Sequence, residues 1–315
     1  MDTRDIGGLS VGAVGLGCMG MTHAYTVGER DEAESARVIH RAIDLGATLI
    51  DTSDVYGPFT NEELVGRALK GRRDEVVLAT KVGLRIPEGE DNRAMYRDGR
   101  PEHIRAAVRE SLRRLGTDRI DLYYLHRVDE DVPLEESWGA LAELVGQGLV
   151  RNLGISDVRP EQIAAAHAIH PVAAVQNELS LWTRDDEAVA WTAEHGVGFV
   201  PYSPLGRGFL TGQYTSSADF GEDDFRARLP RFADEALKAN LAIVDRVRAV
   251  ADRHGATPGQ VAIAWTLAQG DHVVPIPGTK RLTRLEENCG AADLALTDAD
   301  LVELAEVPPP VGTRY

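Results

Sequence analysis

The chain has few cysteines, no long apolar run and a deficit of positive charge. Its 315 residues include two cysteines, too few for a disulfide framework and typical of a protein in a reducing cytoplasm. No apolar stretch approaches the ~20 residues of a membrane helix, and the N-terminus lacks the features of a signal peptide. A net charge of −16 disfavours nucleic-acid binding, because a polyphosphate would be repelled. We therefore expect a cytoplasmic protein that acts on a small molecule, with no evident obligate protein partner.

Metal-binding spacings are also missing, since the sequence has no CxxC, no HExxH and no clustered pair of histidines. The composition, 43% hydrophobic and 27% charged, is that of an ordinary globular protein. No internal repeat or low-complexity segment interrupts it. We therefore expect residues 1–315 to form a single domain, large enough for one α/β barrel, and no bound metal.

Short apolar runs alternate with helical patterns along most of the chain. The runs have the length and turn signals of parallel strands that are buried on both faces. Strands are predicted at residues 14–19, 48–52, 76–82, 121–126, 150–155, 173–177, 198–202 and 273–277. Helices are predicted at residues 31–45, 61–69, 101–115, 134–145, 160–168, 185–195 and 258–267.

Eight strands with helices between them predict an α/β fold, a (β/α)8 or TIM barrel, and an open doubly wound sheet is the alternative. The opening stretch DTRDIGGLSVG predicts a β-hairpin ahead of the barrel, with Gly7 and Gly8 in its turn. Residues 211–236 are rich in Gly, Ser, Asp and Arg, which indicates an exposed loop or lid. Extra helices and long loops are expected at the C-terminal face of the barrel.

The stretch GLGCMG, residues 15–20, matches the dinucleotide-binding fingerprint G-x-G-x-x-G. That fingerprint requires a helix to begin at its third glycine, so that a pyrophosphate meets the helix N-terminus. Here a helical pattern begins only near Asp31, so the spacing does not fit a Rossmann unit. The glycines more simply permit a tight passage from a strand into a loop near a ligand.

Polar side chains stand at the ends of three successive predicted strands. Asp51, Lys81 and His126 end the second, third and fourth strands, and Tyr56 follows in the loop after Asp51. Because the C-terminal ends of barrel strands share one rim, we expect these four side chains to meet there. Alone, Asp51 would be a turn or cap residue and Tyr56 a partly buried aromatic, but a lysine ending an apolar strand needs a partner. Asp54 is interpreted as a turn residue only.

The four residues fit the reduction of a carbonyl group. A carbonyl that accepts a hydride also needs a proton, and Tyr56 could donate it if the Lys81 ammonium lowers its pKa. Asp51 would hold Lys81 charged, since an unpaired buried ammonium is unfavourable. His126 could hydrogen-bond the carbonyl oxygen and orient it.

The sequence resembles the aldo-keto reductase superfamily. The matching motifs are, in order, GLGCMGM, YGPFTNEELVGRAL, ATKVG, LYYLHR, RNLGISD, VQNELSLW, PYSPLGRGFLTG and PIPGTKRLTRLEEN, which span nearly the whole chain. The later motifs look most like those of bacterial and plant members. The resemblance implies NADPH-dependent reduction of aldehydes or ketones to alcohols, with Asp51, Tyr56, Lys81 and His126 as catalytic residues and NADPH extended across the barrel mouth.

Later segments suit NADPH binding in their own right. PYSPLGRGFLTG offers close-approaching backbone amides for a pyrophosphate, although it could be a plain glycine-rich turn. Lys280 and Arg284, at the start of a predicted helix, indicate a site for the 2′-phosphate of NADP rather than NAD. Ser156 and Gln176 could hold the nicotinamide carboxamide, and Tyr202 could stack on the ring. The expected cofactor-binding residues are Gly17, Met19, Asp51, Ser156, Gln176, Tyr202, Ser203, Leu205, Gly206, Gly208, Thr211, Gly278, Thr279, Lys280, Arg284, Glu287 and Asn288.

Two positions in these motifs leave alternatives open. Glu287 and Asn288 resemble the family's adenine-contacting pair, but they equally fit an ordinary helix surface. At Asp157 many relatives carry asparagine. A carboxylate can only accept hydrogen bonds, which puts a contact of Asp157 with the carboxamide in doubt.

The substrate pocket is expected near Tyr25, Tyr96 and Trp182, which suggest a hydrophobic carbonyl compound but could equally be packing residues. The alternative function is a catalytically slow NADP(H)-binding subunit, as in the potassium-channel β subunits that share this fold. A third hypothesis is another barrel enzyme, such as a lyase or isomerase.

Overall fold

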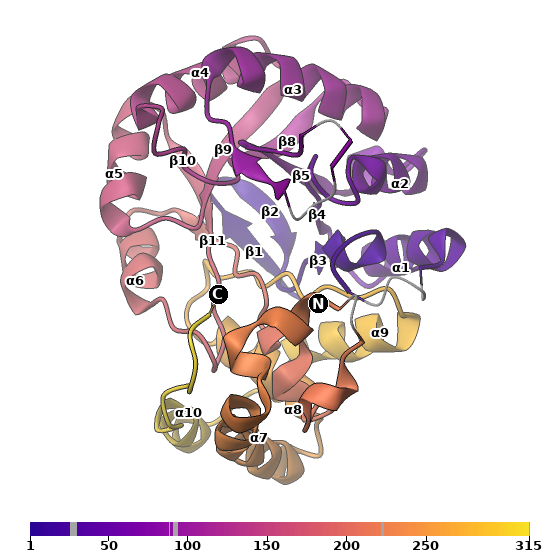
Figure 1. Ribbon diagram of the computed structural model, residues 1–315, viewed down its shortest axis with the longest axis vertical. Helices are drawn as coiled ribbons and strands as arrows, with labels where there is room; N and C mark the ends of the chain where they lie inside the picture. Colours follow the sequence, from indigo (N-terminus) through magenta and orange to yellow (C-terminus); the bar gives the residue numbers. More distant parts are fainter. Residues whose placement is uncertain (26–29, 88, 91–93, 222–223, 315) are drawn as a thin grey trace.

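The computed structural model describes residues 1–25, 30–87, 89–90, 94–221 and 224–314 (Figure 1). Its centre is a parallel seven-stranded sheet in the order β11-β10-β9-β8-β5-β4-β3. The strands are β3 (Leu16–Gly17), β4 (Leu49–Asp51), β5 (Val77–Val82), β8 (Ile120–Leu125), β9 (Val150–Ser156), β10 (Val172–Gln176) and β11 (Gly198–Phe199). Neighbouring strands follow the order of the chain, without the reversal that a doubly wound sheet requires.

Residues 272–278 close this sheet into a barrel. At one edge the Val274 amide donates to the carbonyl oxygen of Phe199 (2.8 Å), and at the other the Gly15 amide donates to that of Pro275 (2.9 Å). The predicted eighth strand is thus an irregular connection rather than a regular strand, because its two prolines have no N–H to donate. The prediction of a (β/α)8 barrel is confirmed.

Helices surround the barrel (Figure 1). They are α1 (Glu32–Asp44), α2 (Thr60–Ala68), α3 (Pro101–Leu115), α4 (Leu134–Gly146), α5 (Pro160–Ile169), α6 (Asp186–Glu194), α7 (Asp234–His254), α8 (Pro258–Leu267), α9 (Leu282–Gly290) and α10 (Asp298–Ala305). The predicted helices are all present, and their ends are marked by local signals such as the proline that opens α3 and the left-handed Gly116 that follows it. The sequence analysis missed α7 and α10, which pack against each other. No helix in the described part of the chain is long and apolar enough to cross a membrane.

The segment 211–236 differs from the exposed loop that its composition indicates. Phe220, Leu229 and Phe232 are buried, and the segment forms short 3-10 turns before α7 begins at Asp234. Its apolar side chains are spaced among polar ones, so that local composition hides their burial against the barrel. Residues 222–223 of the predicted lid lie outside the described residues.

An N-terminal hairpin covers the amino-terminal end of the barrel. Strands β1 (Thr3–Ile6) and β2 (Leu9–Gly12) pair antiparallel, as predicted, and the two glycines of the turn both have positive φ. The hairpin lies close to Ala173 and Gly198, which stand near the starts of β10 and β11. It therefore leaves the opposite, C-terminal rim open for a site.

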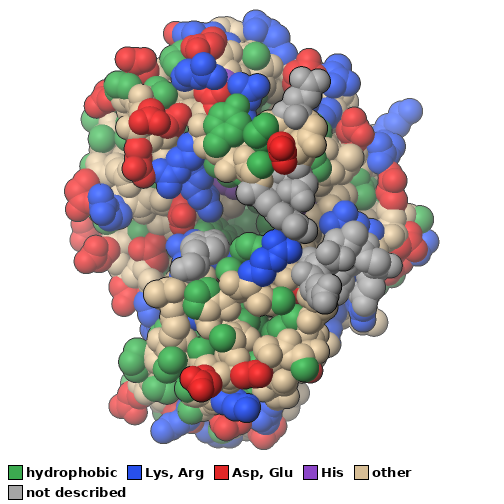
Figure 2. Space-filling model, in the orientation of Figure 1, with side chains coloured by type: hydrophobic (Ala, Val, Ile, Leu, Met, Phe, Trp, Pro, Cys, Tyr) green, Lys and Arg blue, Asp and Glu red, His purple; other side chains and the backbone are tan. Residues whose placement is uncertain are grey.

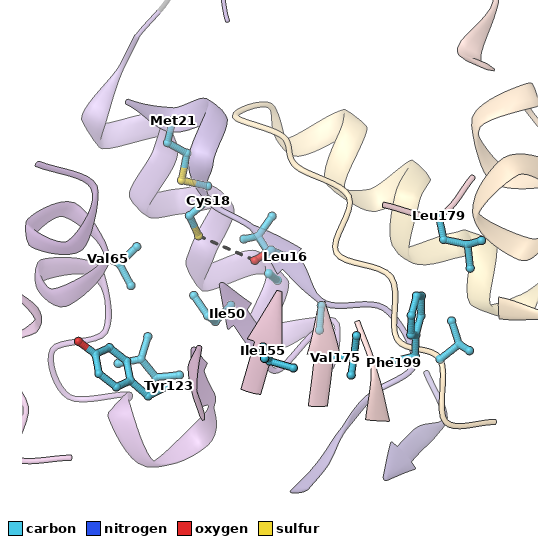
Figure 3. Packing of buried hydrophobic residues seen from close by; sticks show 14 of the residues in the cluster. Leu16, Cys18, Met21, Ile50, Val65, Tyr123, Ile155, Val175, Leu179 and Phe199 are labelled. Atoms are coloured by element: carbon cyan, nitrogen blue, oxygen red, sulfur yellow. Dashed lines mark hydrogen bonds between the residues drawn. The ribbon is translucent and has the colours of Figure 1, made fainter. Parts of the chain in front are cut away.

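The side-chain alternation of the strands divides the core into two layers. The inner layer, inside the barrel, includes Leu49, Ala79, Leu122 and Tyr124. The outer layer lies between the strands and the helices, and Figure 3 shows part of it, with Ile50, Val65, Tyr123, Ile155, Val175 and Phe199 among the labelled residues. Neighbours in sequence, such as Tyr123 and Tyr124, thus belong to different layers.

Candidate active site

The same alternation brings polar side chains to the inside of the barrel at its C-terminal rim. Asp51 lies two residues beyond the inward-facing Leu49 of β4, and Lys81 lies two beyond Ala79 of β5. The parallel register places Asp51 opposite Ala79, so Lys81 lies two residues nearer the C-terminal rim than the position opposite Asp51. His126 follows β8 directly, on the inward side of the same rim. The sequence therefore sets the direction of all three side chains.

Lys81 and Asp51 form a buried ion pair. The Lys81 Nζ lies 2.6 Å from Oδ1 of Asp51 and donates a second hydrogen bond to the carbonyl oxygen of Thr52 (2.7 Å). The Gln176 side-chain amide donates to the other oxygen of Asp51 (2.8 Å). Lys81 is completely buried. A charged lysine in this position is stable only because each partner is in place.

Tyr56 and His126 lie next to this ion pair. The Lys81 Nζ is 5.1 Å from the centroid of the Tyr56 ring, and the His126 ring stands edge-on to Tyr56 with a centroid distance of 6.0 Å. His23 stacks on Tyr56, with a centroid distance of 5.8 Å. The structure therefore brings the four predicted residues together at one rim and adds His23 to them.

The electrostatics of these groups follow from burial and from Lys81. Burial acts to lower the pKa of Lys81, but Asp51 and Tyr56 together outweigh it and raise that pKa above its usual value. Burial raises the pKa of Tyr56, and the Coulombic and hydrogen-bonding effects of Lys81 only partly oppose this shift. The net direction is opposite to the lowered pKa expected from the sequence, because desolvation was not foreseen. Burial, Arg127, Lys81 and His23 hold the pKa of His126 well below its usual value, so its ring is neutral.

The interpretation of Asp54 as a turn residue only is incomplete. Asp54 lies in the turn after β4, but its side chain is buried, and its Oδ1 lies within hydrogen-bond distance of the Ser53 oxygen (3.1 Å). The Ser53 oxygen also lies 3.2 Å from Nδ1 of His126. Asp54 is thus linked to the rim through one hydroxyl group.

Ser156 and Gln176 end the adjacent strands β9 and β10, as expected. Both are buried, and the Ser156 hydroxyl donates to the carbonyl oxygen of Gln176 (2.8 Å). Arg127 lies beside them, with one guanidinium nitrogen 3.3 Å from the Ser156 oxygen. Ser156 and Gln176 therefore present adjacent polar groups next to Asp51.

Asp157 has a left-handed backbone (φ 57°) and a carboxylate held by two arginines. Arg127 lies 3.3 Å and Arg314 3.0 Å from its oxygens, and the Tyr202 hydroxyl donates to it (3.2 Å). Burial acts to raise the pKa of Asp157, but the two arginines outweigh it and hold the pKa below its usual range. The carboxylate is therefore occupied by cations, which agrees with the doubt about its contact with a carboxamide.

Tyr202, expected to stack on a nicotinamide ring, is covered on one side by Arg314. The Arg314 guanidinium lies 5.6 Å from the Tyr202 ring centroid and also contacts the Tyr202 hydroxyl. Arg314 donates further to the carboxylate of Glu178 (2.7 Å). A ring stacked on that side of Tyr202 would have to displace this contact.

The segment 203–212 is an unusual run of left-handed backbone. Ser203, Gly206, Arg207, Gly208 and Gly212 all have positive φ. A Cβ at Gly208 would lie 2.8 Å from the Tyr214 ring, so only glycine fits there. The predicted Leu205 and Thr211 lie in the same segment, with Thr211 bound to the Gly208 carbonyl (2.7 Å). Successive turns of this kind expose amides that suit an anionic group.

Gly17 and Gly278, predicted to bind the cofactor, face each other where the barrel closes. They form an isolated parallel bridge, and a Cβ at Gly17 would lie 2.9 Å from the carbonyl oxygen of Ile276. Met19 begins a short 3-10 helix just beyond Gly17. Helix α1 begins only at Glu32, so the expectation that GLGCMG does not open a Rossmann helix is confirmed.

The N-terminus of α9 lacks a side-chain cap, and basic residues surround it. Thr279 and Lys280 precede the helix, and Arg284 lies in its first turn, where it pairs with Glu287 (2.9 Å) and reaches Gln213 (3.4 Å). This last contact places the α9 terminus beside segment 203–212. Uncapped amides with nearby cations fit a phosphate group.

The two residues expected to contact adenine differ in their environment. Asn288 is buried, so it is not the ordinary surface residue that was the alternative. Glu287 accepts hydrogen bonds from the Thr257 hydroxyl (2.7 Å) and from Arg284. Both lie on α9, next to the left-handed segment.

The three residues predicted to line the substrate pocket differ in exposure and in their contacts. Tyr96 is exposed on β7 (Tyr96–Arg97), which pairs with β6 (Leu84–Arg85) beyond the rim. Tyr25 lies beside Arg226, whose guanidinium is 5.1 Å from its ring. Trp182 is buried and stacks on Phe209 at 4.1 Å, so most of its surface belongs to the core. Among the described residues its indole nitrogen has no hydrogen-bond partner.

Figure 2 shows that the face seen in Figure 1 is hollowed near its centre, with lysine or arginine side chains at the border of the hollow. Basic groups on this rim include Arg127, Arg207 and Arg314, which pair with Asp157 or Glu178. A net acidic protein thus carries local cations where an anionic ligand would enter. No cluster of His, Cys, Asp or Glu suited to a metal ion occurs in the described part of the chain.

Sequence reasoning missed several residues that line the site. His23, Ser53, Arg127 and Arg314 contact the rim, yet none stands in a distinctive pattern. His23 and Arg127 could have been suspected because each neighbours a residue or loop already assigned to the site. Arg314 gave no signal, because only the folded chain brings it there.

Comparison with known proteins gives a consistent result. The model of the Aldo/keto reductase family matches residues 13–308. A probable aldo-keto reductase of Glycine max is 45% identical over 314 residues, which cover 98% of this chain and 89% of that protein.

Solved structures agree with this match. A glycerol dehydrogenase of Gluconobacter oxydans superimposes with a TM-score of 0.87 at 32% identity, covering 100% of this chain and 98% of that one. The holo form of an aldo-keto reductase from Bacillus halodurans gives 0.80 at 29% identity, covering 100% and 98%. The chain therefore belongs to the aldo/keto reductase family.

Proposed function

We propose that this protein is an NADPH-dependent reductase of aldehydes or ketones in which Tyr56 is the proton donor. Membership of the family makes it an oxidoreductase that acts on small carbonyl compounds. The finer assignment rests chiefly on one observation: a fully buried lysine, paired with Asp51, lies directly beside the buried Tyr56.

Each rim residue has a distinct task in this proposal. Tyr56 gives its proton to the carbonyl oxygen, and the Lys81 ammonium stabilises the phenolate that remains. Asp51 keeps Lys81 charged and in position. Because the His126 ring is neutral, it can donate a hydrogen bond to the carbonyl oxygen while its own charge stays unchanged. NADPH, when bound, supplies the hydride to the carbonyl carbon.

The residues of the rim fit such a cofactor. Segment 203–212 and the uncapped start of α9 lie side by side and offer amides and cations to phosphate groups. Lys280 and Arg284 would hold the 2′-phosphate, and Ser156 with Gln176 would hold the carboxamide. A phosphate at Arg284 would compete with its present ion pair to Glu287.

The proposal is tested by NADPH oxidation with a panel of aromatic aldehydes, sugars, steroids and diketones. Tyr56→Phe should reduce turnover at least about 100-fold and leave NADPH affinity nearly unchanged, because only the proton donor is lost. Tyr123→Phe, which removes a buried hydroxyl from the outer layer, is the control and should keep turnover. Unchanged turnover in Tyr56→Phe would contradict the assignment. Tight NADPH binding without turnover of any carbonyl would instead favour a regulatory subunit.

Cofactor preference is tested separately. Lys280→Ala with Arg284→Ala should weaken NADPH binding by at least about tenfold and change NADH binding little, since charge-assisted bonds to the 2′-phosphate are lost. Arg281→Ala, beside them in sequence, is the control. Equal weakening for both cofactors would contradict the 2′-phosphate site.

A further inference from the structure

We propose that Asp54, acting through Ser53, determines which nitrogen of His126 carries the proton, and thereby whether Nε2 of His126 can donate a hydrogen bond to the substrate oxygen. Asp54 is a positioning residue in this scheme, because it touches neither substrate nor cofactor. The effect on turnover rests on the proposed function, but the effect on His126 does not.

The geometry is a chain of three side chains. The Ser53 oxygen lies 3.1 Å from Oδ1 of Asp54 and 3.2 Å from Nδ1 of His126. Ser53 is fully buried, and Asp54 and His126 are nearly so, with exposed fractions of 3% and 7%. A hydroxyl has one proton, so it can donate to only one of its two neighbours at a time. If both contacts are hydrogen bonds, the neighbour that does not accept from the hydroxyl must donate a hydrogen bond to its oxygen.

The surroundings of Asp54 favour its protonated form. The charge of Glu62 of α2 acts on Asp54 and raises its pKa, and Arg114 of α3 is paired with Glu62 through a 2.6 Å contact. Glu62 also accepts a hydrogen bond from Thr80 of β5 (2.7 Å). The Arg114 guanidinium therefore acts on two buried carboxyl groups, those of Asp54 and Glu62, and its ion pair is with Glu62.

The pKa of Asp54 follows from this arrangement. Burial and the Glu62 carboxylate raise the pKa of Asp54 to about 8, against the smaller lowering effects of Arg114, Ser53 and the Val55 amide. Tyr123 of β8 is the further titratable group near Asp54, and burial raises its pKa well above the usual value. Asp54 is thus the group in this network that changes charge near neutral pH.

His126 stays neutral on both sides of that transition. Burial lowers its pKa well below the usual value, and the charges of Arg127, Lys81 and His23 act in the same direction. A change at Asp54 cannot charge the ring in such surroundings. It can only select between the two neutral tautomers.

With Asp54 protonated, the direction of donation is fixed. The carboxyl O–H donates to the Ser53 oxygen, and the Ser53 O–H donates to Nδ1 of His126. Nε2 then carries the ring proton and can donate to a carbonyl oxygen, as reduction requires.

With Asp54 ionised, every hydrogen bond in the chain reverses. Ser53 donates to the carboxylate, Nδ1 of His126 carries the ring proton and donates to Ser53, and Nε2 has a free lone pair. That nitrogen can no longer donate a hydrogen bond to the substrate oxygen. The balance is one proton: it leaves from Nε2, while the Ser53 proton passes to Nδ1 and the Asp54 proton to Ser53. No electron pair or bond to carbon changes in the switch.

The direct test is ¹⁵N NMR of the histidine side chains in the full-length protein, with the His126 signals assigned by a His126→Gln variant. We expect the Nε2–H tautomer at about pH 6 and the Nδ1–H tautomer at about pH 9.5, on either side of the Asp54 transition. Asp54→Asn, whose amide can still donate to Ser53, should keep the Nε2–H tautomer throughout. A single tautomer in the wild type at all pH values, or an unaltered switch in Asp54→Asn, would overturn the proposal.

Ser53→Ala supplies a second variant that does not change charge. It should remove the pH dependence of the tautomer while Asp54 remains. Persistence of the switch in this variant would contradict a route through Ser53. Asp129→Asn, at another buried carboxylate that accepts the Gly99 amide (2.9 Å), is the control and should behave as wild type.

Turnover supplies an independent readout of the hydrogen bond from Nε2 of His126. In the wild type, carbonyl-reduction turnover at saturating NADPH should fall by up to about tenfold per pH unit above the transition, and in Asp54→Asn this fall should be absent. Superimposable profiles would overturn the effect on turnover. Absence of turnover with every carbonyl, together with a normal tautomer switch, would refute the proposed function and leave the control of His126 standing.

Discussion

Two buried polar networks lie on either side of strands β4 and β5, and they balance charge differently. The inner network, inside the barrel, gives Asp51 its own cation, Lys81, at 2.6 Å. The outer network, between the strands and helices α2 and α3, has one cation, Arg114, for Glu62 and Asp54. Asp51 and Asp54 therefore differ in charge balance: Asp51 is paired with an ammonium, whereas burial and the Glu62 carboxylate raise the pKa of Asp54.

The contrast shows that burial alone does not decide the state of a carboxyl group. Asp51 and Asp54 have the same exposed fraction, 3%. What differs is the neighbouring charge: an ammonium faces Asp51, and a second carboxylate faces Asp54. Ser53 and His126 connect the two networks, so that the outer one can influence the inner one.

Breaking the inner pair should have the largest effect. Lys81→Met leaves the Asp51 carboxylate buried without a cation, which should lower the free energy of unfolding by about 3–5 kcal/mol. Turnover should fall at least about 100-fold, because the proposed proton donor loses its charge partner. Denaturant unfolding and NADPH oxidation measure the two effects.

The matched control is the double variant Asp51→Asn with Lys81→Met, which removes both charges. It should recover much of the stability but none of the turnover, since a neutral pair has no uncompensated charge. A double variant as unstable as the single one would show that shape, not charge, holds this region.

Breaking the outer pair should affect stability more than turnover. Arg114→Met leaves Glu62 without its cation, and the free energy of unfolding should fall by about 3 kcal/mol. Turnover at about pH 6 should stay within about twofold, because Asp54 is protonated there with or without Arg114. The neighbouring Arg113→Met, which loses only an exposed pair with Glu110, should change stability by less than about 1 kcal/mol. Equal losses for the two arginines would contradict the outer network.

The smallest effect, taken over a single pH unit, is a pH dependence of stability that comes from Asp54. Its folded pKa is raised, so between the unfolded pKa near 4 and the folded pKa of about 8 the folded state binds more protons. Stability should therefore fall in this window as pH rises, by up to roughly 1 kcal/mol per pH unit. Asp54→Asn should remove this slope, which unfolding experiments at several pH values measure. A parallel pH dependence in wild type and variant would contradict the raised pKa.

Much of the fold could be predicted because its signals are local. The predicted helices agree with the observed ones because proline, acidic first turns and terminal glycines mark their ends within a few residues. Helix α7 was missed because polar residues around its start resemble a loop, although Leu237, Val244, Val247 and Ala251 follow a helical spacing. The segment that closes the barrel was predicted, but as a regular eighth strand rather than as an irregular connection.

The site could be predicted in part for the same reason. Asp51, Lys81 and His126 lie at strand ends, and the period of two then fixes which way each side chain points. Asp157 was singled out because many relatives carry asparagine there, but its arginine partners were not foreseen, because Arg314 reaches it only through the folded chain. The pKa of Tyr56 was misjudged because a sequence shows a neighbouring charge more readily than it shows desolvation.

The sequence by itself determined the barrel, the rim on which polar residues gather and the identity of the four side chains that meet there. The tertiary structure alone decided the raised pKa of Asp54, the direction of the Tyr56 pKa shift and the partners of Asp157. The physical reason is range. Periodicity and capping act within a few residues, whereas ion pairing and burial join segments as distant in sequence as Glu62 and Arg114.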